Sequence, residues 1–314
     1  MKKMLCIILC AAMCACAGIN EKKKLTLISY NTPVFDDSYV QLAWEGFASV
    51  STEADVSFME SSNQKEFEKN LKLVMDGGAD LIFAPTFTAL ESVSIEAQEH
   101  PDISFVVGDA VIDTSIPNLT GISFAVAEAS FLAGYIAANM AQSGKIGFVG
   151  GMDVSAIHPF LRGYEQGAKY ADKDIEVLTR YIGTFIDSSL ARSAAEELFA
   201  QGADVIFHSA GAAGHGVIYA AAAQGKWAIG VDEDQTRLAP ANVLTCVVKN
   251  IDTAVASLMQ DYLNGRTIGG INFEYGLNEG GVGLAKNNGN VPGELYIEAM
   301  EIAEMIQRGE ITAE

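Results

Sequence analysis

One structural unit occurs twice along this chain: a short apolar strand, a helix, and a second strand that ends in aspartate. In the later copy, GADVIFHS begins at Gly202 and the second strand ends at Asp232. In the earlier copy, GADLIFAP begins at Gly78 and the second strand ends at Asp109. The offsets are 202 − 78 = 124 and 232 − 109 = 123 residues. Uninterrupted apolar strands that alternate with helices are typical of parallel sheets covered on both faces. The repeat therefore predicts two similar α/β lobes.

The repeat also predicts where a ligand binds. The opening strands KLTLISY and KIGFVGG begin 145 − 24 = 121 residues apart, so whole lobes are duplicated. Ligands of open parallel sheets bind beyond the carboxyl ends of the strands. We expect Asp109 and Asp232 to face one another across a cleft, with the glycine-rich turn at Gly211 beside them.

Aromatic side chains follow several of the expected strands. The loop after the first strand carries Phe35, Asp36 and Tyr39, which can stack on a flat ring and bind its polar edge. The alternative is that Phe35 or Tyr39 packs against its own strand. In the second lobe, Phe160 and Phe185 follow strands in the same manner.

The two lobes are expected to be joined by three crossing strands at residues 119–124, 244–248 and 273–277. The first lobe then comprises residues 25–124 and 249–271, and the second comprises 125–248 and 272–314. Lys249 is predicted to lie in or near the hinge. The last helix, predicted at residues 293–309, is grouped with the second lobe, although its pattern does not indicate where it packs.

The amino-terminal segment is typical of a bacterial lipoprotein signal. Lys2 and Lys3 precede an apolar run from Leu5 to Ala12, which is too short to span a bilayer stably. We expect residues 1–15 to be a signal peptide, Cys16 to be lipidated, and residues 16–24 to form a tether. The alternative is an ordinary secretory signal cleaved nearby. Either way, the predicted location is outside the cytoplasm, and lipid on Cys16 would anchor the protein to a bacterial membrane.

Charge and motifs argue against several functions. The formal charge is −20, from 20 basic and 40 acidic residues, so binding to nucleic acid is not expected. The chain contains no P-loop, no dinucleotide fingerprint and no G-x-S-x-G nucleophile elbow. The four histidines lack metal-ligand spacing. We therefore predict neither a metal nor a cofactor, and a protein that is not an enzyme.

An ordered set of motifs resembles the basic membrane protein family of bacterial lipoproteins. The motifs are SFLAGYIAA (130–138), KIGFVGGM (145–152), GADVIFHSAG (202–211), GVIYAA (216–221) and AIGVDEDQ (228–235). The resemblance covers residues 25 to about 283. It implies a type I periplasmic-binding-protein fold, with two Rossmann-like lobes, parallel sheets and a three-strand hinge. It also implies a small-molecule ligand and, as partners, the permease and ATPase subunits of an ABC importer.

The same resemblance implies roles for the residues of the cleft. Asp36, Tyr39, Asp109 and Phe185 match positions that hold an aromatic base. Asp232, Gly211 and Lys249 match positions around a ribose.

Val40 departs from the family, which usually has an asparagine there that contacts the base edge. The ligand is therefore either a purine nucleoside bound by another edge, or a ring that is apolar at this edge. Riboflavin, known as the ligand of another branch, has methyl groups on its ring and hydroxyls on its ribityl chain, and Val40 favours it slightly.

Three other classes compete with an importer subunit. A nucleoside-processing enzyme would turn its ligand over. A cytoplasmic regulator of this fold would need a DNA-binding helix pair before residue 24, where this chain has a signal segment. A surface adhesin role could coexist with ligand binding.

Overall fold

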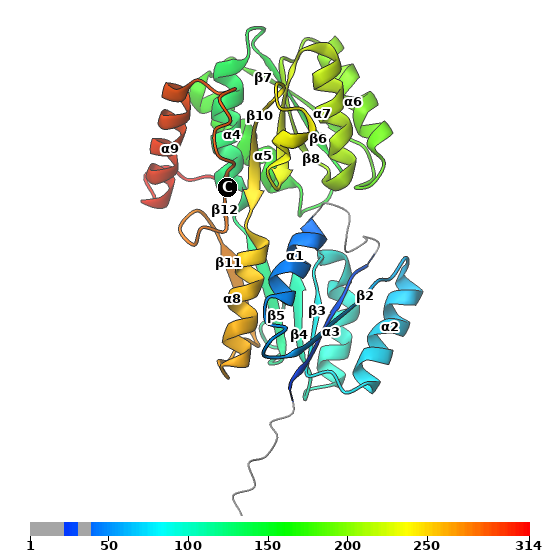
Figure 1. Ribbon diagram of the computed structural model, residues 1–314. Helices are drawn as coiled ribbons and strands as arrows, with labels where there is room; N and C mark the ends of the chain where they lie inside the picture. The colour runs from blue at the N-terminus through cyan, green and yellow to red at the C-terminus, as the bar shows by residue number, and fades with distance from the viewer. Residues whose placement is uncertain (1–21, 31–38) are drawn as a thin grey trace, which may run out of the picture.

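The computed structural model describes residues 22–30 and 39–314 and shows two lobes, each built on one sheet (Figure 1). Each sheet has six strands. The predicted positions Phe35, Asp36 and Cys16 lie outside the described residues.

The first sheet has the strand order β11-β5-β4-β3-β1-β2, and its described strands all pair in parallel. Its strands are β1 (Lys24–Ile28), β2 (Asp55–Met59), β3 (Leu81–Ala84), β4 (Ser104–Gly108), β5 (Leu119–Phe124) and β11 (Ile271–Tyr275). Its helices are α1 (Tyr39–Ala48), α2 (Gln64–Asp76), η1 (Phe87–Ala89), α3 (Leu90–Glu99) and α8 (Ile251–Leu263).

The second sheet has the order β12-β10-β9-β8-β6-β7, which matches the first strand for strand. Its strands are β6 (Lys145–Gly150), β7 (Glu176–Tyr181), β8 (Val205–Ser209), β9 (Trp227–Asp232), β10 (Val243–Lys249) and β12 (Val282–Leu284). Its helices are α4 (Val126–Met140), α5 (His158–Ala171), α6 (Ser188–Ala200), η2 (Gly211–Gly214), α7 (His215–Gln224), η3 (Gln235–Leu238) and α9 (Gly293–Gln307). The predicted duplication of an α/β lobe is confirmed. Among the described strands, only β12 and β10 pair in antiparallel orientation.

Helices cover both faces of each sheet, and the central strands are largely apolar and buried. Successive side chains of a strand point to opposite faces. In β3, Leu81 and Phe83 join the core under α1 and α8, whereas Ile82 joins the core under α2 and α3. In β8, Phe207 and Ile206 divide in the same way between two cores. Burial on both faces explains the uninterrupted apolar runs in the sequence.

The chain passes between the lobes three times, directly after β5, β10 and β11. The three crossings were predicted, but two boundaries need correction. Residues 272–275 pair with β5 in the first sheet, whereas the boundary at 271 assigned them to the second lobe. Lys249 pairs with Val282 in the second sheet, whereas the boundary at 248 assigned it to the first lobe. In both cases the strand continues to the hinge before the chain changes lobe.

The terminal helix α9 packs on the second lobe. Ile302 and Ile306 of α9 share a buried cluster with Phe131 and Leu132 of α4. Figure 1 shows α9 beside α4, on the outer side of that lobe. None of the helices formed by the described residues is both long and apolar enough to cross a bilayer.

Candidate functional site

The two aspartates of the repeat share an unusual backbone conformation. Asp109 follows β4 with φ 51°, and Asp232 ends β9 with φ 68°. Among the described residues, no other non-glycine residue has positive φ. This left-handed conformation is disfavoured for L-residues and is tolerated best by Asp and Asn. Both aspartates lie at the carboxyl ends of their strands, where the repeat predicted a ligand site, and such strain often marks a functional position.

Lys249, the last residue of β10, forms an ion pair with Asp109. Its Nζ lies 2.7 Å from Asp109 Oδ1 and 2.9 Å from Oδ2. The lysine side chain is 3% exposed and the aspartate side chain is 26% exposed. Nζ also lies 4.2 Å from the ring centroid of Tyr39 and 4.9 Å from that of Phe124. A carboxylate and two aromatic faces together compensate the buried ammonium group.

Tyr39, the first residue of α1, presents a buried hydroxyl to this cluster. Burial raises the pKa of Tyr39 well above its ordinary value, and the negative charges of Asp109 and Asp232 raise it further. The side chain is therefore a neutral phenol in the neighbourhood of both aspartates. Its hydroxyl makes no hydrogen bond of regular geometry to the described residues, and neither does the buried hydroxyl of Ser29 after β1. Buried hydroxyls without a regular hydrogen bond are uncommon in folded proteins, so both groups single out this region.

Close helix packing holds Tyr39 and Lys249 together. Helix α1 begins at Tyr39, and α8 begins two residues after Lys249. A Cβ atom at Gly46 of α1 would collide with the backbone of Asp252 in α8. Gly216 of α7 allows the same close approach to the backbone at Ser188 of α6. Glycine at these two contacts allows α1 to pack closely on α8, and α7 to pack closely on α6.

Phe185 and Gly211 come together on the second lobe. Phe185 lies in the loop after β7, and its ring lies against Gly151, where any side chain would overlap it. Gly211 has φ 54°, and its missing Cβ would be 3.5 Å from Phe185 Cβ. The carbonyl oxygen of Phe185 accepts a hydrogen bond of 2.9 Å from the Ala213 amide. This loop and η2 thus form one rigid surface at the carboxyl ends of β7 and β8.

Phe160 and Val40, two other predicted ligand residues, lie in the core. Phe160 of α5 is 5% exposed, and its ring centroid is 6.3 Å from that of Phe207. Val40, the second residue of α1, is 1% exposed and belongs to the buried cluster on the inner side of that helix. Contact of either side chain with a ligand remains a prediction.

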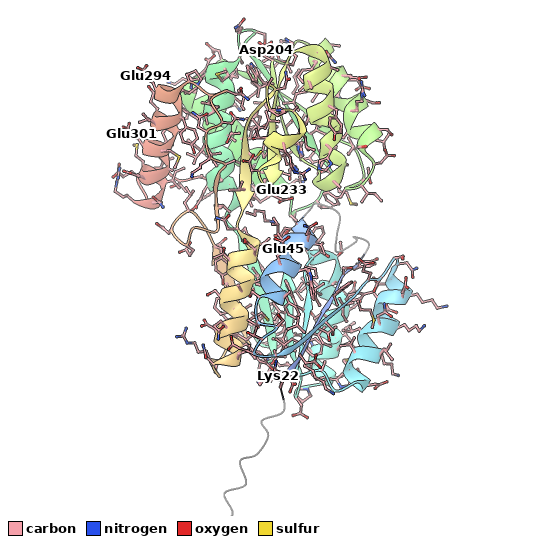
Figure 2. The ribbon with its side chains drawn as sticks, in the orientation of Figure 1. Lys22, Glu45, Asp204, Glu233, Glu294 and Glu301 are labelled. Atoms are coloured by element: carbon pink, nitrogen blue, oxygen red, sulfur yellow. The ribbon has the colours of Figure 1, made fainter. Side chains whose placement is uncertain are left out.

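The sequence analysis missed two features of this region. Phe124, at the end of β5, places its ring beside Lys249, and its position at the end of a crossing strand was the only indication of this. His208 and Gln235 form a buried hydrogen bond of 2.9 Å behind Asp232. The separation of His208 and Gln235 by 27 residues gave no local pattern that could reveal it. Figure 2 labels Glu233, the residue after Asp232, on the side of the second lobe that faces the first lobe.

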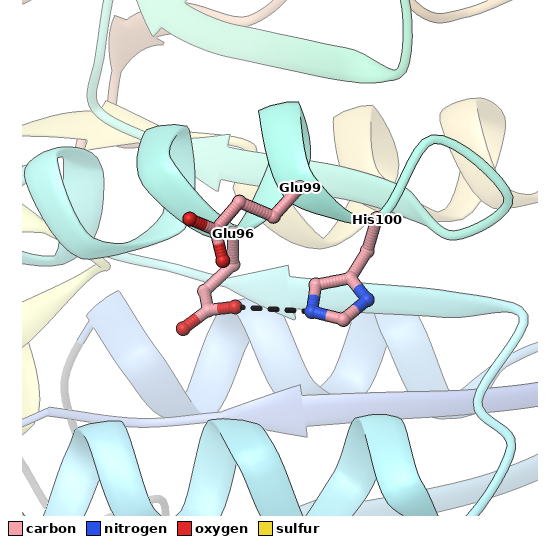
Figure 3. Close-up of side chains that lie close together, drawn as sticks. All are labelled: Glu96, Glu99 and His100. Carbon is pink, nitrogen blue, oxygen red and sulfur yellow. Dashed lines mark ion pairs between the residues drawn. The ribbon is translucent and has the colours of Figure 1, made fainter.

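A separate group of possible metal ligands lies at the end of α3. Among residues 22–30 and 39–314, only Glu96, Glu99 and His100 bring three such atoms within 4.8 Å of one another (Figure 3). His100 Nε2 is 3.3 Å from Glu96 Oε2, an i,i+4 pair at a helix carboxyl terminus. The group precedes β4, whereas Asp109 follows it, so the two lie beyond opposite ends of that strand. It is therefore separate from the interlobe cluster.

Two lobes of this topology with three crossings define a type I periplasmic-binding protein, and known proteins agree. A crystal structure of an ABC transporter solute-binding protein from Aeropyrum pernix K1 superposes with a TM-score of 0.82, is 26% identical, and covers 92% of each chain. A transcriptional activator of the comK gene from Bacillus halodurans has a TM-score of 0.76 at 26% identity, over 91% of this chain and 98% of its own.

Sequence comparison gives the family. Residues 23–314 match the profile of the Bmp family, described as PnrA-like ABC transporter substrate-binding proteins. "Basic membrane protein A" of Borreliella burgdorferi is 36% identical over 324 residues, which cover 99% of this chain and 95% of that protein. The chain belongs to the Bmp family, as its motifs predicted. It is a substrate-binding protein of an ABC transporter, not an enzyme, and it works on the extracytoplasmic side of the membrane.

Replacing Lys249 with methionine should destabilise the protein. The change keeps an unbranched side chain of similar length but leaves Asp109 without its buried cation, and we expect a loss of about 1–3 kcal/mol in unfolding free energy. Urea unfolding measures the difference. The matched control is Lys226→Met, which removes an ion pair of 2.6 Å with Asp204 at a partly exposed position and should cost less than about 1 kcal/mol. Equal losses would contradict a special role for the buried pair.

The stability of the protein should fall in acid partly because of His208. Burial lowers the pKa of His208 from 6.5 to about 3. Between these two values the unfolded chain binds a proton that the folded protein does not, so stability is lost as pH falls below 6.5. The slope from this residue is about 1.4 kcal/mol per pH unit. Urea unfolding at several pH values should show a shallower slope for His208→Gln, and parallel curves would contradict the assignment.

Proposed function

We propose that the cleft captures an aromatic heterocycle that carries a ribityl chain or a ribose, and delivers it to the permease of an ABC importer. Riboflavin is the first candidate and a purine nucleoside is the second. The observation that carries the proposal is the cluster of Tyr39, Lys249 and Asp109, with Asp232 close enough to affect the pKa of Tyr39. It combines an aromatic face with charged groups that accept and donate hydrogen bonds.

The chemistry of each group supports this class of ligand. Carboxylates accept hydrogen bonds from hydroxyls, and an ammonium group donates to hydroxyl oxygens. Asp232 and Lys249 would hold the hydroxylated end of the ligand. Tyr39 and Phe185 would hold the ring, and each stacked aromatic pair is worth about 0.5–1.5 kcal/mol beyond burial. One lysine and two aspartates give a net negative cluster, which disfavours phosphorylated ligands.

Val40 bears on the choice between the two candidates. The family resemblance implies an asparagine at this position, and an apolar side chain there favours a ring with an apolar edge, such as that of riboflavin. Val40 is, however, buried on the inner side of α1. A side chain removed from the cleft need not change the contacts to the base, which supports the purine nucleoside as the second candidate. The preceding loop, which includes Phe35 and Asp36, lies outside the described residues.

Ligand identity and the role of Asp232 can be tested together. Mass spectrometry of the purified protein should find a co-purifying flavin or nucleoside, and calorimetry should then measure binding of riboflavin and guanosine. We expect Asp232→Ala to weaken binding of the preferred ligand at least tenfold, because hydroxyls in the cleft lose a charged acceptor. Absence of binding by the unmodified protein to either compound rejects the proposed ligand class. Normal affinity of the variant rejects only the role of Asp232.

We also propose that Cys16 carries a lipid that anchors the protein to the membrane surface. The basic residues, the short apolar run and the small residue before Cys16 support this. In cells that express the full chain, radiolabelled palmitate should enter the protein but not its Cys16→Ser variant. The variant should leave the membrane fraction. Equal labelling of both proteins would argue against a lipid at this cysteine.

A further inference from the structure

The turn that carries Asp232 is strained. The amide of Glu233 donates a hydrogen bond of 2.9 Å to the carbonyl oxygen of Val231, which closes a three-residue turn around Asp232. With φ 68° at its centre, this is the rare form of the γ-turn, whose central residue has positive φ. Such turns persist only where the surrounding structure holds them in place.

Gln235 provides that support from within the second lobe. Its side-chain oxygen accepts hydrogen bonds from the Val231 amide at 3.2 Å and from His208 Nε2 at 2.9 Å. The backbone amide of Gln235 donates a hydrogen bond of 3.2 Å to Cys246 Sγ. Gln235 is 3% exposed. Its three partners lie on β9, β8 and β10, so it links three adjacent strands.

The surroundings fit a glutamine at this position closely. A Cβ atom at Gly230 would come within 2.6 Å of Gln235 Oε1 and 2.7 Å of Cys246 Sγ, so the glycine leaves room for both. Burial raises the pKa of the Cys246 thiol to about 12, which leaves the sulfur neutral. Cys246 therefore acts here as a hydrogen-bond acceptor in the core.

The hydrogen bonds also define the proton positions. A backbone amide can only donate, so the Gln235 atom that faces Val231 must be the oxygen. His208 must then donate to the same oxygen from Nε2, which leaves its Nδ1 without a proton in the neutral ring. The lowered pKa of His208 agrees with a neutral imidazole. The two donors converge on one acceptor, and a hydrophobic side chain at position 235 would leave both without a partner.

We infer that Gln235, oriented by His208, is a positioning residue that holds the strained turn at Asp232 and so keeps the Asp232 carboxylate in place for the ligand. The inference rests on the proposed role of Asp232 in ligand binding. The buried hydrogen bonds of Gln235 stabilise the conformation of the turn. His208 then supports the site without contacting the ligand.

The first test compares a hydroxylated ligand with its ring alone. Gln235→Met keeps the length of the side chain and removes the acceptor. It should weaken binding of riboflavin or guanosine about tenfold, with little change for lumichrome or guanine, which lack the hydroxylated part. In an Asp232→Ala background the same change should have no further effect. The control is Gln98→Met, the same substitution at an exposed position of α3, which should leave all affinities unchanged.

The second test needs no ligand, so it separates failure of this inference from failure of the proposed function. Hydrogen exchange followed by NMR should show the amides of Val231 and Glu233 exchanging at least tenfold faster in Gln235→Met than in Gln98→Met. Unchanged exchange at both amides would overturn the inference, whether or not riboflavin or guanosine binds. Equal weakening of the hydroxylated ligand and its ring would also overturn it, because a positioning role for Asp232 affects only the hydroxylated part.

Discussion

The ion pair between Lys249 and Asp109 joins the end of β10 in one sheet to the end of β4 in the other. A buried ammonium without a partner is strongly unfavourable, so the position of Lys249 at a lobe crossing depends on a carboxylate at this point. The rings of Tyr39 and Phe124 complete its surroundings. The relative placement of α1, β5 and the hinge therefore follows from the need to compensate one positive charge. A ligand bound at the proposed site would meet this compensated group rather than a free cation.

The two lobes both place an aspartate with positive φ at the site, with different supports. Asp109 and Asp232 occupy equivalent strand ends, and both have positive φ. The carboxylate of Asp109 accepts hydrogen bonds from an ammonium group, whereas the turn at Asp232 is linked through Gln235 to the core of its own lobe. Both copies of the repeat thus have positive φ at this aspartate, while the groups around each aspartate differ. A ligand with chemically distinct ends matches that asymmetry.

The sequence predicted most of the fold because burial on two faces leaves a plain apolar pattern, and because duplication repeats that pattern. The predictions that Asp109 and Asp232 lie at strand ends followed from the same periodicity, whereas Lys249 was predicted only to lie in or near the hinge. The boundary within β11 was misplaced because a crossing strand and an edge strand are both short and partly apolar. The link between His208 and Gln235 depends on side chains brought together only by the sheet. Whether Val40 or Phe160 reaches a ligand depends on side-chain orientation, which residue type alone does not determine.

The pairing of β11 with β5 has a consequence for how the chain folds. It joins Ile271 to Thr120, which are 271 − 120 = 151 residues apart, and the whole second sheet except β12 is encoded between them. During synthesis the first lobe therefore lacks β11 and α8, and the second lobe lacks β12 and α9, until nearly the entire chain is made. Contacts so distant in sequence slow folding, because a long loop must close before they form. Each lobe is thus completed late, by segments that follow the second and third crossings of the chain.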